Sequence, residues 1–194
     1  ATCQRAVEQV LTAYENALHA CPADDHRFRI EHCYGLPTAD QFRRMGERKI
    51  VWSTQPAFMH FRMEMYYRRF GDRWPGVHPH RLGLDHGVTV AGGSDSFVTP
   101  LYPLLGIHCG VNHPIEDQRV GVAEALRWFT CNAAFAAFAD ADTGSIAPGK
   151  LADLTVLAAD ILTADAATIK DIPVVMTIIG GEIRHSAGPT GESS

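Results

Sequence analysis

The sequence lacks the features of membrane proteins and of nucleic-acid-binding proteins. No apolar run in the 194 residues approaches the roughly 18 residues that a membrane-spanning helix needs, and no basic-then-apolar leader opens the chain. Lys and Arg number 17 against 22 Asp and Glu, and they form no dense basic stripe. We therefore expect neither a membrane nor a nucleic acid as a partner.

Cysteine is sparse and shows no pattern. The five cysteines are scattered, odd in number and without C-x-x-C spacing, so they indicate neither a disulfide framework nor a zinc ribbon. We expect reduced thiols, mostly packed as small apolar groups, in a cytoplasmic protein.

The composition is that of an ordinary globular protein, 46% hydrophobic and 20% charged. The length fits one domain, or one domain and a fragment. The chain opens in a helix, because apolar residues recur at helical spacing from Val7 to Leu18 and Cys21-Pro22 ends the pattern.

Short apolar segments then alternate with helical patterns. Strand-like segments cover 27–32, 50–54 and 88–91, and helical patterns cover 38–45, 79–86, 101–111 and 122–139. This alternation predicts parallel strands joined by right-handed helical crossovers. In the first strand, Phe28, Ile30 and His32 share one face. Arg29 and Glu31 share the other face, where they can neutralise each other.

The stretch 59–74 is rich in aromatic residues and methionine, with arginines interleaved. Two interpretations stay open for it: a helix that packs on the core, or a loop and helix that cover a pocket.

After residue 143 the pattern changes to strands. Residues 154–157 and 174–179 are strand-like, and Gly180-Gly181 is a two-residue turn into 182–185, which predicts a hairpin. We therefore divide the chain into an α/β unit over 1–143, a β unit over 144–186 and a flexible tail over 187–194.

Each strand of the α/β unit leads into a polar residue suited to chemistry: His32, Gln55 and Asp95. The carboxyl ends of parallel strands meet at one edge of a sheet. Imidazole nitrogen and carboxylate oxygen both bind zinc-like ions, and a carboxylate at a metal can also accept a proton from the metal's water. His32 and Asp95 are therefore candidate metal ligands, and Asp95 is also the candidate catalytic residue.

Several motifs resemble the closing part of the amidohydrolase superfamily, in the branch that contains N-substituted formamide deformylase. They are Arg29-Ile-Glu-His32, Ser53-Thr-Gln-Pro56, Gly92-Gly-Ser-Asp95, Glu124-Ala-Leu126, Asn132-Ala-Ala134, Gly144-Ser-Ile-Ala-Pro-Gly-Lys150 and Ala152-Asp-Leu-Thr-Val-Leu157. The resemblance runs from Thr2 to about His185. It implies an α/β fold that is the C-terminal part of a (β/α)8 TIM barrel, about three βα units, followed by part of a small β-sandwich.

The same resemblance implies roles for the strand-end residues. His32 is the metal-binding histidine of the sixth barrel strand. Asp95 is the aspartate of the eighth, which touches the metal and carries a proton from the attacking water to the leaving amine. Gln55 ends the seventh strand and is expected to contact a small-molecule substrate. The cofactor implied is a divalent metal, zinc, as one or two ions, and the activity is hydrolysis of a carbon–nitrogen bond other than a peptide bond, in an amide, formamide or cyclic amide.

The sequence departs from the family because most of the ligand set is missing. The full site also needs a His-x-His from the first strand, a lysine or acidic ligand from the fourth and a histidine from the fifth, and we expect these outside this chain. His78-Pro-His80 has the letters of His-x-His, but no strand leads into it, and we interpret it as the start of a helix. His108 and His113 remain candidates for the rim of a pocket.

Three strands cannot close a barrel, which takes about 250 residues. We therefore expect free strand edges beside Ile30 and Val51, which must pair with something else. The candidates are the missing N-terminal half and a second copy in a homo-oligomer.

Two functions stay open. The chain is either the C-terminal portion of a metal-dependent hydrolase, or a catalytically incomplete fragment or assembly module with no activity of its own. A decarboxylase or deaminase of the same superfamily is a nearer alternative, because the same ligands serve water attack on several electrophiles.

Overall fold

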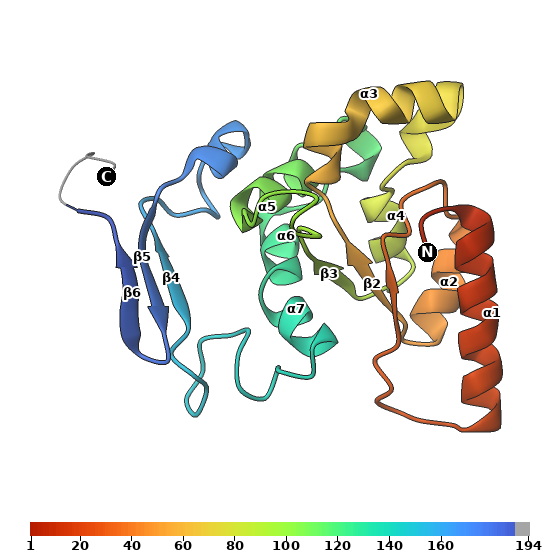
Figure 1. The fold of residues 1–194 in the computed structure, drawn as a ribbon, viewed down its shortest axis with the longest axis horizontal. Helices are drawn as coiled ribbons and strands as arrows, with labels where there is room; N and C mark the ends of the chain where they lie inside the picture. The colour runs from red at the N-terminus through yellow and green to blue at the C-terminus, as the bar shows by residue number, and fades with distance from the viewer. Residues whose placement is uncertain (189–194) are drawn as a thin grey trace.

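The computed structural model describes residues 1–188, which form two β-sheets with helices around and between them (Figure 1). The helices are α1 (Gln4–Ala20), α2 (Ala39–Glu47), α3 (Phe58–Phe70), α4 (His80–Asp85), α5 (Pro103–Val111), α6 (Val122–Trp128) and α7 (Cys131–Ala136). The strands are β1 (Arg29–Glu31), β2 (Val51–Thr54), β3 (Val90–Gly92), β4 (Leu154–Leu157), β5 (Val174–Ile179) and β6 (Glu182–Ser186). Short 3-10 helices cover η1 (Gly71–Gly76), η2 (Glu116–Gln118) and η3 (Ala166–Asp171).

The first sheet is parallel, in the order β1-β2-β3, and each strand is joined to the next through a helix. The predicted mixed α/β architecture with parallel strands is therefore confirmed. The expected free edge beside Val51 is wrong, because β2 is the central strand and the edges belong to β1 and β3.

Both edges of this sheet receive hydrogen bonds from outside it. The main-chain nitrogen of Ala1 donates to the carbonyl of Glu31 at 3.0 Å, and the carbonyl of Ala1 accepts from the amide of Cys33 at 2.9 Å. At the other edge, the side-chain amide of Asn132 donates to the carbonyl of Val90 at 2.8 Å. Main-chain groups that a further strand would engage are thus partly satisfied within the chain.

The core lies on one face of the parallel sheet. Ile30, Trp52 and Val90 are in register on neighbouring strands and are at most 1% exposed. They pack against Val7 and Leu11, which come from the predicted apolar stripe of α1. Burial of each such side chain contributes roughly 1.5–3 kcal/mol.

Helix α2 is joined to α1 by polar contacts. It begins with the predicted capping box, in which the amides of Thr38 and Gln41 each donate to the other's side chain at 3.1 Å. The guanidinium of Arg44 then bonds Glu8 and Glu15 of α1 and holds the pKa of both carboxyls below their ordinary values.

The opposite face of β1 carries an ion pair. Nε of Arg29 lies 2.6 Å from a carboxylate oxygen of Glu31, which confirms the predicted neutralisation. Arg29 also donates to the carbonyl of Ala136 at 3.0 Å, so α7 lies against this side of the sheet.

The predicted helix over 122–139 is broken into α6 and α7. The hydroxyl of Thr130 donates to the carbonyl of Leu126 at 2.8 Å, four residues back, and so competes for an acceptor of the helical ladder. Thr130 itself has φ −125° and ψ −104°, outside the helical region, and α7 starts at the next residue.

The stretch 59–74 forms α3 and η1. Phe58, Tyr66 and Phe70 of α3 pack with Val77 and with Tyr34 from the segment after β1. Helix α3 follows β2 after three residues and lies beyond the carboxyl edge of the sheet (Figure 1). The stretch therefore has its own apolar cluster and also covers the edge where the candidate residues lie.

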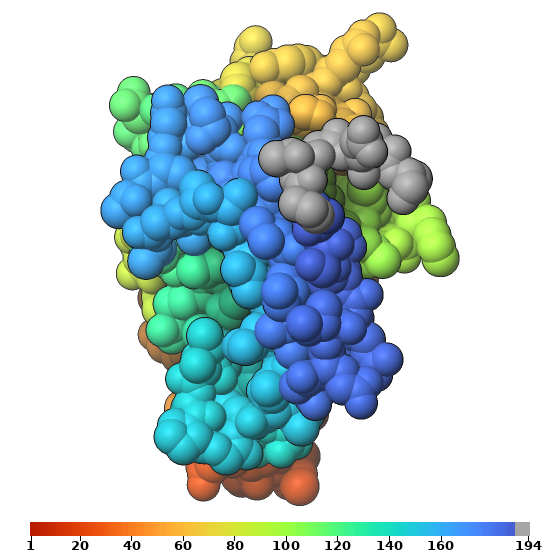
Figure 2. All heavy atoms as spheres, turned by 90° about the vertical axis from the view of Figure 1, so that its left-hand side faces the viewer, coloured from red at the N-terminus to blue at the C-terminus, as the bar shows by residue number. Residues whose placement is uncertain are grey.

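The second sheet is antiparallel, in the order β4-β5-β6. Its predicted hairpin is confirmed: Gly180 and Gly181 have φ of +60° and +84°, as a tight two-residue turn requires. This sheet forms much of the face seen in Figure 2. Three of its apolar side chains are exposed: Val156, Ile179 and Ile183. The side-chain amide of Asn112 in the segment after α5 donates to Ala166 at 2.8 Å and links the second sheet's unit to the first. The predicted tail, 187–194, lies mostly outside the described residues.

Among residues 1–188, no helix is both long and apolar enough to cross a membrane. All five cysteines are free, as expected, and Cys33 and Cys109 are buried.

Three histidines are buried close to one another. His78 and His80 are fully buried and His113 is 1% exposed, and the ring of His80 lies 5.8 Å from each of the other two. Helix α4 begins at His80, so the interpretation of His78-Pro-His80 as a helix start is confirmed. The expectation that His113 lies at a pocket rim is wrong, because the residue is only 1% exposed.

Burial keeps these rings neutral. It lowers the pKa of His78 to about 3 and that of His113 to about 4, and it lowers the pKa of His80 well below its ordinary value. The hydroxyls of Tyr66 and Thr54 lie 3.0 Å and 3.2 Å from Nε2 of His78 and His80. In the described part of the chain, Nδ1 of both rings has no partner, so a charged ring would be poorly solvated.

We predict that the protein loses stability as the pH falls from 6.5 to 5. In this window the unfolded chain protonates the three histidines at their ordinary pKa of 6.5, whereas the folded chain resists protonation. Burial also lowers the pKa of His108, which adds to the slope with the same sign. Stability is therefore complete above pH 6.5 and falls by up to about 1.4 kcal/mol per pH unit for each histidine. Urea unfolding followed at several pH values measures this slope.

The ordinary pKa of glutamate, 4.5, lies below this window, so the ion-paired carboxyls add to the slope mainly at its lower end. The variant His78→Gln removes one titrating group, and its slope is expected to be smaller by about one histidine's share. A wild-type unfolding free energy that stays constant between pH 6.5 and 5 would contradict the prediction.

Candidate metal centre

The candidate residues follow the carboxyl ends of adjacent strands. Hydrogen bonding continues one residue beyond each strand, because the amide of His32 donates to Ser53 at 2.8 Å and that of Gly93 donates to Thr54 at 2.9 Å. His32 and the segment that leads to Asp95 therefore flank β2 at the same edge of the sheet. Two strand spacings, about 10 Å, separate their backbones at this edge.

The main chain of His32 departs from the strand and is fixed by a buried tryptophan. His32 has φ +72°, in the left-handed region, so the regular alternation of the strand ends there. The indole Nε1 of Trp52 donates to the carbonyl of His32 at 2.7 Å. The imidazole is flanked by Phe58 and Tyr34, with ring centroids 6.2 Å and 6.3 Å away.

Gln55 contacts His32 directly. Oε1 of Gln55 lies 2.9 Å from Nδ1 of His32, and Gln55 is only 3% exposed. Sequence reasoning placed Gln55 at the same edge but did not foresee this hydrogen bond. Its expected contact with a substrate stays a prediction.

Asp95 lies in the loop that follows β3. It is exposed and has φ +52°. The loop folds back on itself, because the carbonyl of Asp95 accepts from Val98 at 2.6 Å and the carbonyl of Ser94 accepts from the hydroxyl of Thr99 at 2.5 Å. Of the two glycines before Ser94, Gly92 has no room for a side chain, because a Cβ there would lie 2.7 Å from the ring of Phe129. A Cβ at Gly93 would meet no atom within 4 Å.

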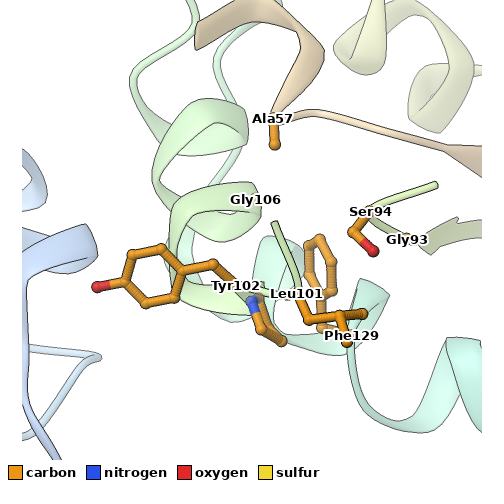
Figure 3. A pocket seen from close by; sticks show the side chains of 8 residues that line it. Ala57, Gly93, Ser94, Leu101, Tyr102, Gly106 and Phe129 are labelled. Carbon is orange, nitrogen blue, oxygen red and sulfur yellow. The ribbon is translucent and has the colours of Figure 1, made fainter. Parts of the chain in front are cut away.

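A cavity of about 310 Å³ lies next to this loop. Its lining comes from the ends of β2 and β3, the start of α5 and the end of α6: Ala57, Gly93, Ser94, Leu101, Tyr102, Pro103, Gly106 and Phe129. Figure 3 shows the Phe129 ring between Leu101 and Gly106, and the Tyr102 ring turned away from Ser94. The hydroxyl of Tyr102 bonds the carbonyl of Lys170 in the second unit. The cavity is therefore mainly apolar, with one hydroxyl next to the candidate aspartate.

Two other groups near this edge of the sheet, Cys33 and His108, do not offer further metal ligands beside Asp95. Burial raises the pKa of the Cys33 thiol to about 12, so it is not a thiolate ligand or nucleophile at neutral pH. His108 is half-buried beside Asn112, facing the second unit, and does not line the cavity. Within residues 1–188, no group of three His, Cys, Asp or Glu side chains is arranged to hold a metal ion.

The donor set nevertheless fits part of a metal site. Hydrogen bonding at Nδ1 leaves Nε2 as the ring nitrogen of His32 that can bind an ion, and Asp95 offers an exposed carboxylate from the same edge. The geometry therefore defines an α/β protein that carries two candidate metal ligands, an imidazole and a carboxylate, at the carboxyl edge of its parallel sheet.

The comparison with known proteins identifies the family. The chain belongs to the Amidohydrolase family, whose model matches residues 1–185. It is 30% identical over 189 residues to the putative amidohydrolase YtcJ of Bacillus subtilis strain 168, a match that covers 92% of this chain and 35% of that protein. It is 29% identical over 189 residues to N-substituted formamide deformylase of Arthrobacter pascens, covering 93% of this chain and 34% of that protein.

The fold is likewise similar to solved structures. An uncharacterized metal-dependent hydrolase from Pyrococcus furiosus matches with a TM-score of 0.64 and 26% identity, over 77% of this chain and 30% of that one. The chain thus spans about a third of the length of the relatives that it matches. The resemblance stated from the sequence motifs is confirmed at the level of the family.

We predict that Trp52→Phe weakens zinc binding by the full-length protein about tenfold. The substitution removes the indole donor that fixes the carbonyl of His32, so the imidazole is less well positioned. Competition with a chromophoric chelator measures the affinity.

Trp128→Phe is the matched control. Trp128 is buried in the same cluster and also packs on His80, but it makes no hydrogen bond to His32. We expect both variants to be less stable in urea and only Trp52→Phe to lose zinc affinity. Equal zinc affinities in the two variants would show that the indole does not position His32.

Proposed function

We propose that this chain is the C-terminal portion of a metal-dependent hydrolase that cleaves a carbon–nitrogen bond other than a peptide bond. The observation that supports the proposal is that His32 and the loop carrying Asp95 leave the parallel sheet at the same carboxyl edge, on either side of β2. The family match over residues 1–185 and the metal-dependent hydrolase of similar fold support it.

In this proposal the three βα units are part of a (β/α)8 barrel, and the second sheet is part of a small β-sandwich. Nε2 of His32 and the carboxylate of Asp95 supply two ligands for a divalent metal, zinc, as one or two ions. A catalytic zinc site takes about three protein ligands. The remaining ligands come from the rest of the protein, which also pairs with the edges of the parallel sheet, and the reduced thiols are consistent with a cytoplasmic location.

A divalent metal held by His32 and Asp95 would supply Lewis-acid chemistry, which polarises a carbonyl and activates water. Asp95 then acts as the proton carrier: its carboxylate accepts the proton of the attacking water and gives it to the leaving nitrogen. Its exposed position in the loop after β3 gives it access to both. His32 would hold the metal through Nε2, while Gln55 stays on its Nδ1.

The cavity beside the loop that carries Asp95 supports a substrate class. Its apolar lining favours an apolar substituent on the nitrogen or the acyl carbon, and Ser94 offers a hydroxyl near the polar bond (Figure 3). Amides and formamides with an alkyl or aryl substituent meet this description, and the name of the Arthrobacter relative supports the formamide.

We predict that Asp95→Asn lowers kcat of the full-length protein by about 10²- to 10⁴-fold, because an amide cannot take up the proton. Hydrolysis of N-alkyl and N-aryl formamides, followed by release of the amine, measures the effect. Dialysis against a chelator is expected to abolish the wild-type activity, and zinc is expected to restore it.

Asp117→Asn is the control, since Asp117 is exposed on η2, far along the chain from the sheet edge. Undiminished turnover by Asp95→Asn would refute the role of Asp95. Release of ammonia or carbon dioxide from other superfamily substrates, with no formamide hydrolysis, would assign a deaminase or a decarboxylase instead.

A further inference from the structure

The hydrogen bond between His32 and Gln55 bears on which ring nitrogen of His32 carries the proton. An imidazole has two ring nitrogens, and in the neutral form only one of them carries a proton. A metal binds the nitrogen that does not, so the partner of the other nitrogen decides which tautomer is competent. Gln55 is the partner of Nδ1, at 2.9 Å.

The nitrogen of the Gln55 side-chain amide indicates which way round the amide lies. Nε2 of Gln55 points to the carbonyl of Ser53, 3.5 Å away, and Oε1 points to Nδ1 of His32. The reversed amide would set a carbonyl oxygen against the oxygen of Ser53, which is repulsive. With an oxygen opposite it, Nδ1 must carry the ring proton, and the lone pair is then at Nε2.

The surroundings restrict the position of the His32 ring. Phe58 and Tyr34 flank the imidazole, and burial raises the pKa of Tyr34, so its hydroxyl stays protonated. Gln55 itself is 3% exposed, so water competes little for its amide.

We propose that Gln55 is a positioning residue that holds His32 in the Nδ1–H tautomer and so presents Nε2 to the metal. The inference rests on the proposed function, since it concerns the same ion. It assigns to Gln55 an action through His32, in place of a direct contact with substrate. A neutral amide in this role adds no charge to the site, unlike the carboxylate that often supports a metal-binding histidine.

Three variants of the full-length protein test the proposal. Gln55→Met keeps an unbranched side chain but removes the acceptor, and we expect zinc affinity to fall about 10- to 100-fold. Gln55→Glu keeps an oxygen opposite Nδ1, and we expect affinity within about threefold of the wild type. Gln41→Met is the matched control, because Gln41 is equally buried, at 3% exposure, and is bonded to α1 and the capping box instead of to His32.

Two further measurements separate positioning from structure. Nitrogen-15 spectra of the metal-free protein report the tautomer of His32, which we expect to be Nδ1–H in the wild type and in Gln55→Glu, and mixed or Nε2–H in Gln55→Met. Steady-state kinetics at saturating zinc distinguish positioning of His32 from a direct substrate contact, because the loss of a substrate contact would raise KM alone.

Unchanged zinc affinity and an unchanged tautomer in Gln55→Met would overturn the proposal, and so would a rise in KM with zinc affinity intact. If His32→Ala binds zinc as tightly as the wild type, the proposed metal site fails. The tautomer spectra still decide whether Gln55 holds the ring, so the two failures are distinguishable. Should Gln55→Met fold poorly, the spectra and affinity of Gln55→Glu retain the test, because a shift of that variant to Nε2–H overturns the proposal.

Discussion

The parallel pairing of β2 with both β1 and β3 is the constraint on which the rest of the structure depends. Its register places Ile30, Trp52 and Val90 on one face, where the helices cover them. The same register gathers the strand ends at one edge. A slip of one residue would exchange the two faces of a strand and separate the core from the edge residues.

The sheet joins core packing to the candidate site through one residue. Trp52 is at once the largest fully buried side chain of the sheet and the donor to the carbonyl of His32. The packing that stabilises the fold therefore also fixes the backbone of a candidate ligand. This explains how His32 holds a left-handed conformation that is uncommon for a residue with a side chain.

Local patterns were sufficient to predict most elements. The stripe of α1, the capping box at Thr38 and the turn at Gly180-Gly181 depend on neighbours in sequence, and all three occur as expected. The helix break at Thr130 was missed, because a threonine bonding back to its own helix has no distinct sequence signature.

The site was predictable only in part. Strand order places His32, Gln55 and Asp95 at one edge, and this follows from the alternation of strands and helices. The bond between His32 and Gln55 and the burial of His80 depend on side-chain positions between segments far apart in sequence. Histidine serves as ligand, surface residue and packing residue, so the residue type alone did not distinguish these roles.

The placement of His80 gives the molecule a built-in optical reporter. Its ring lies 5.2 Å from Trp52 and 4.9 Å from Trp128, which are two of the three tryptophans in the sequence. An imidazolium ion quenches indole emission strongly at such separations, whereas the uncharged ring does so weakly. The emission of these two tryptophans is therefore expected to fall when His80 takes up a proton.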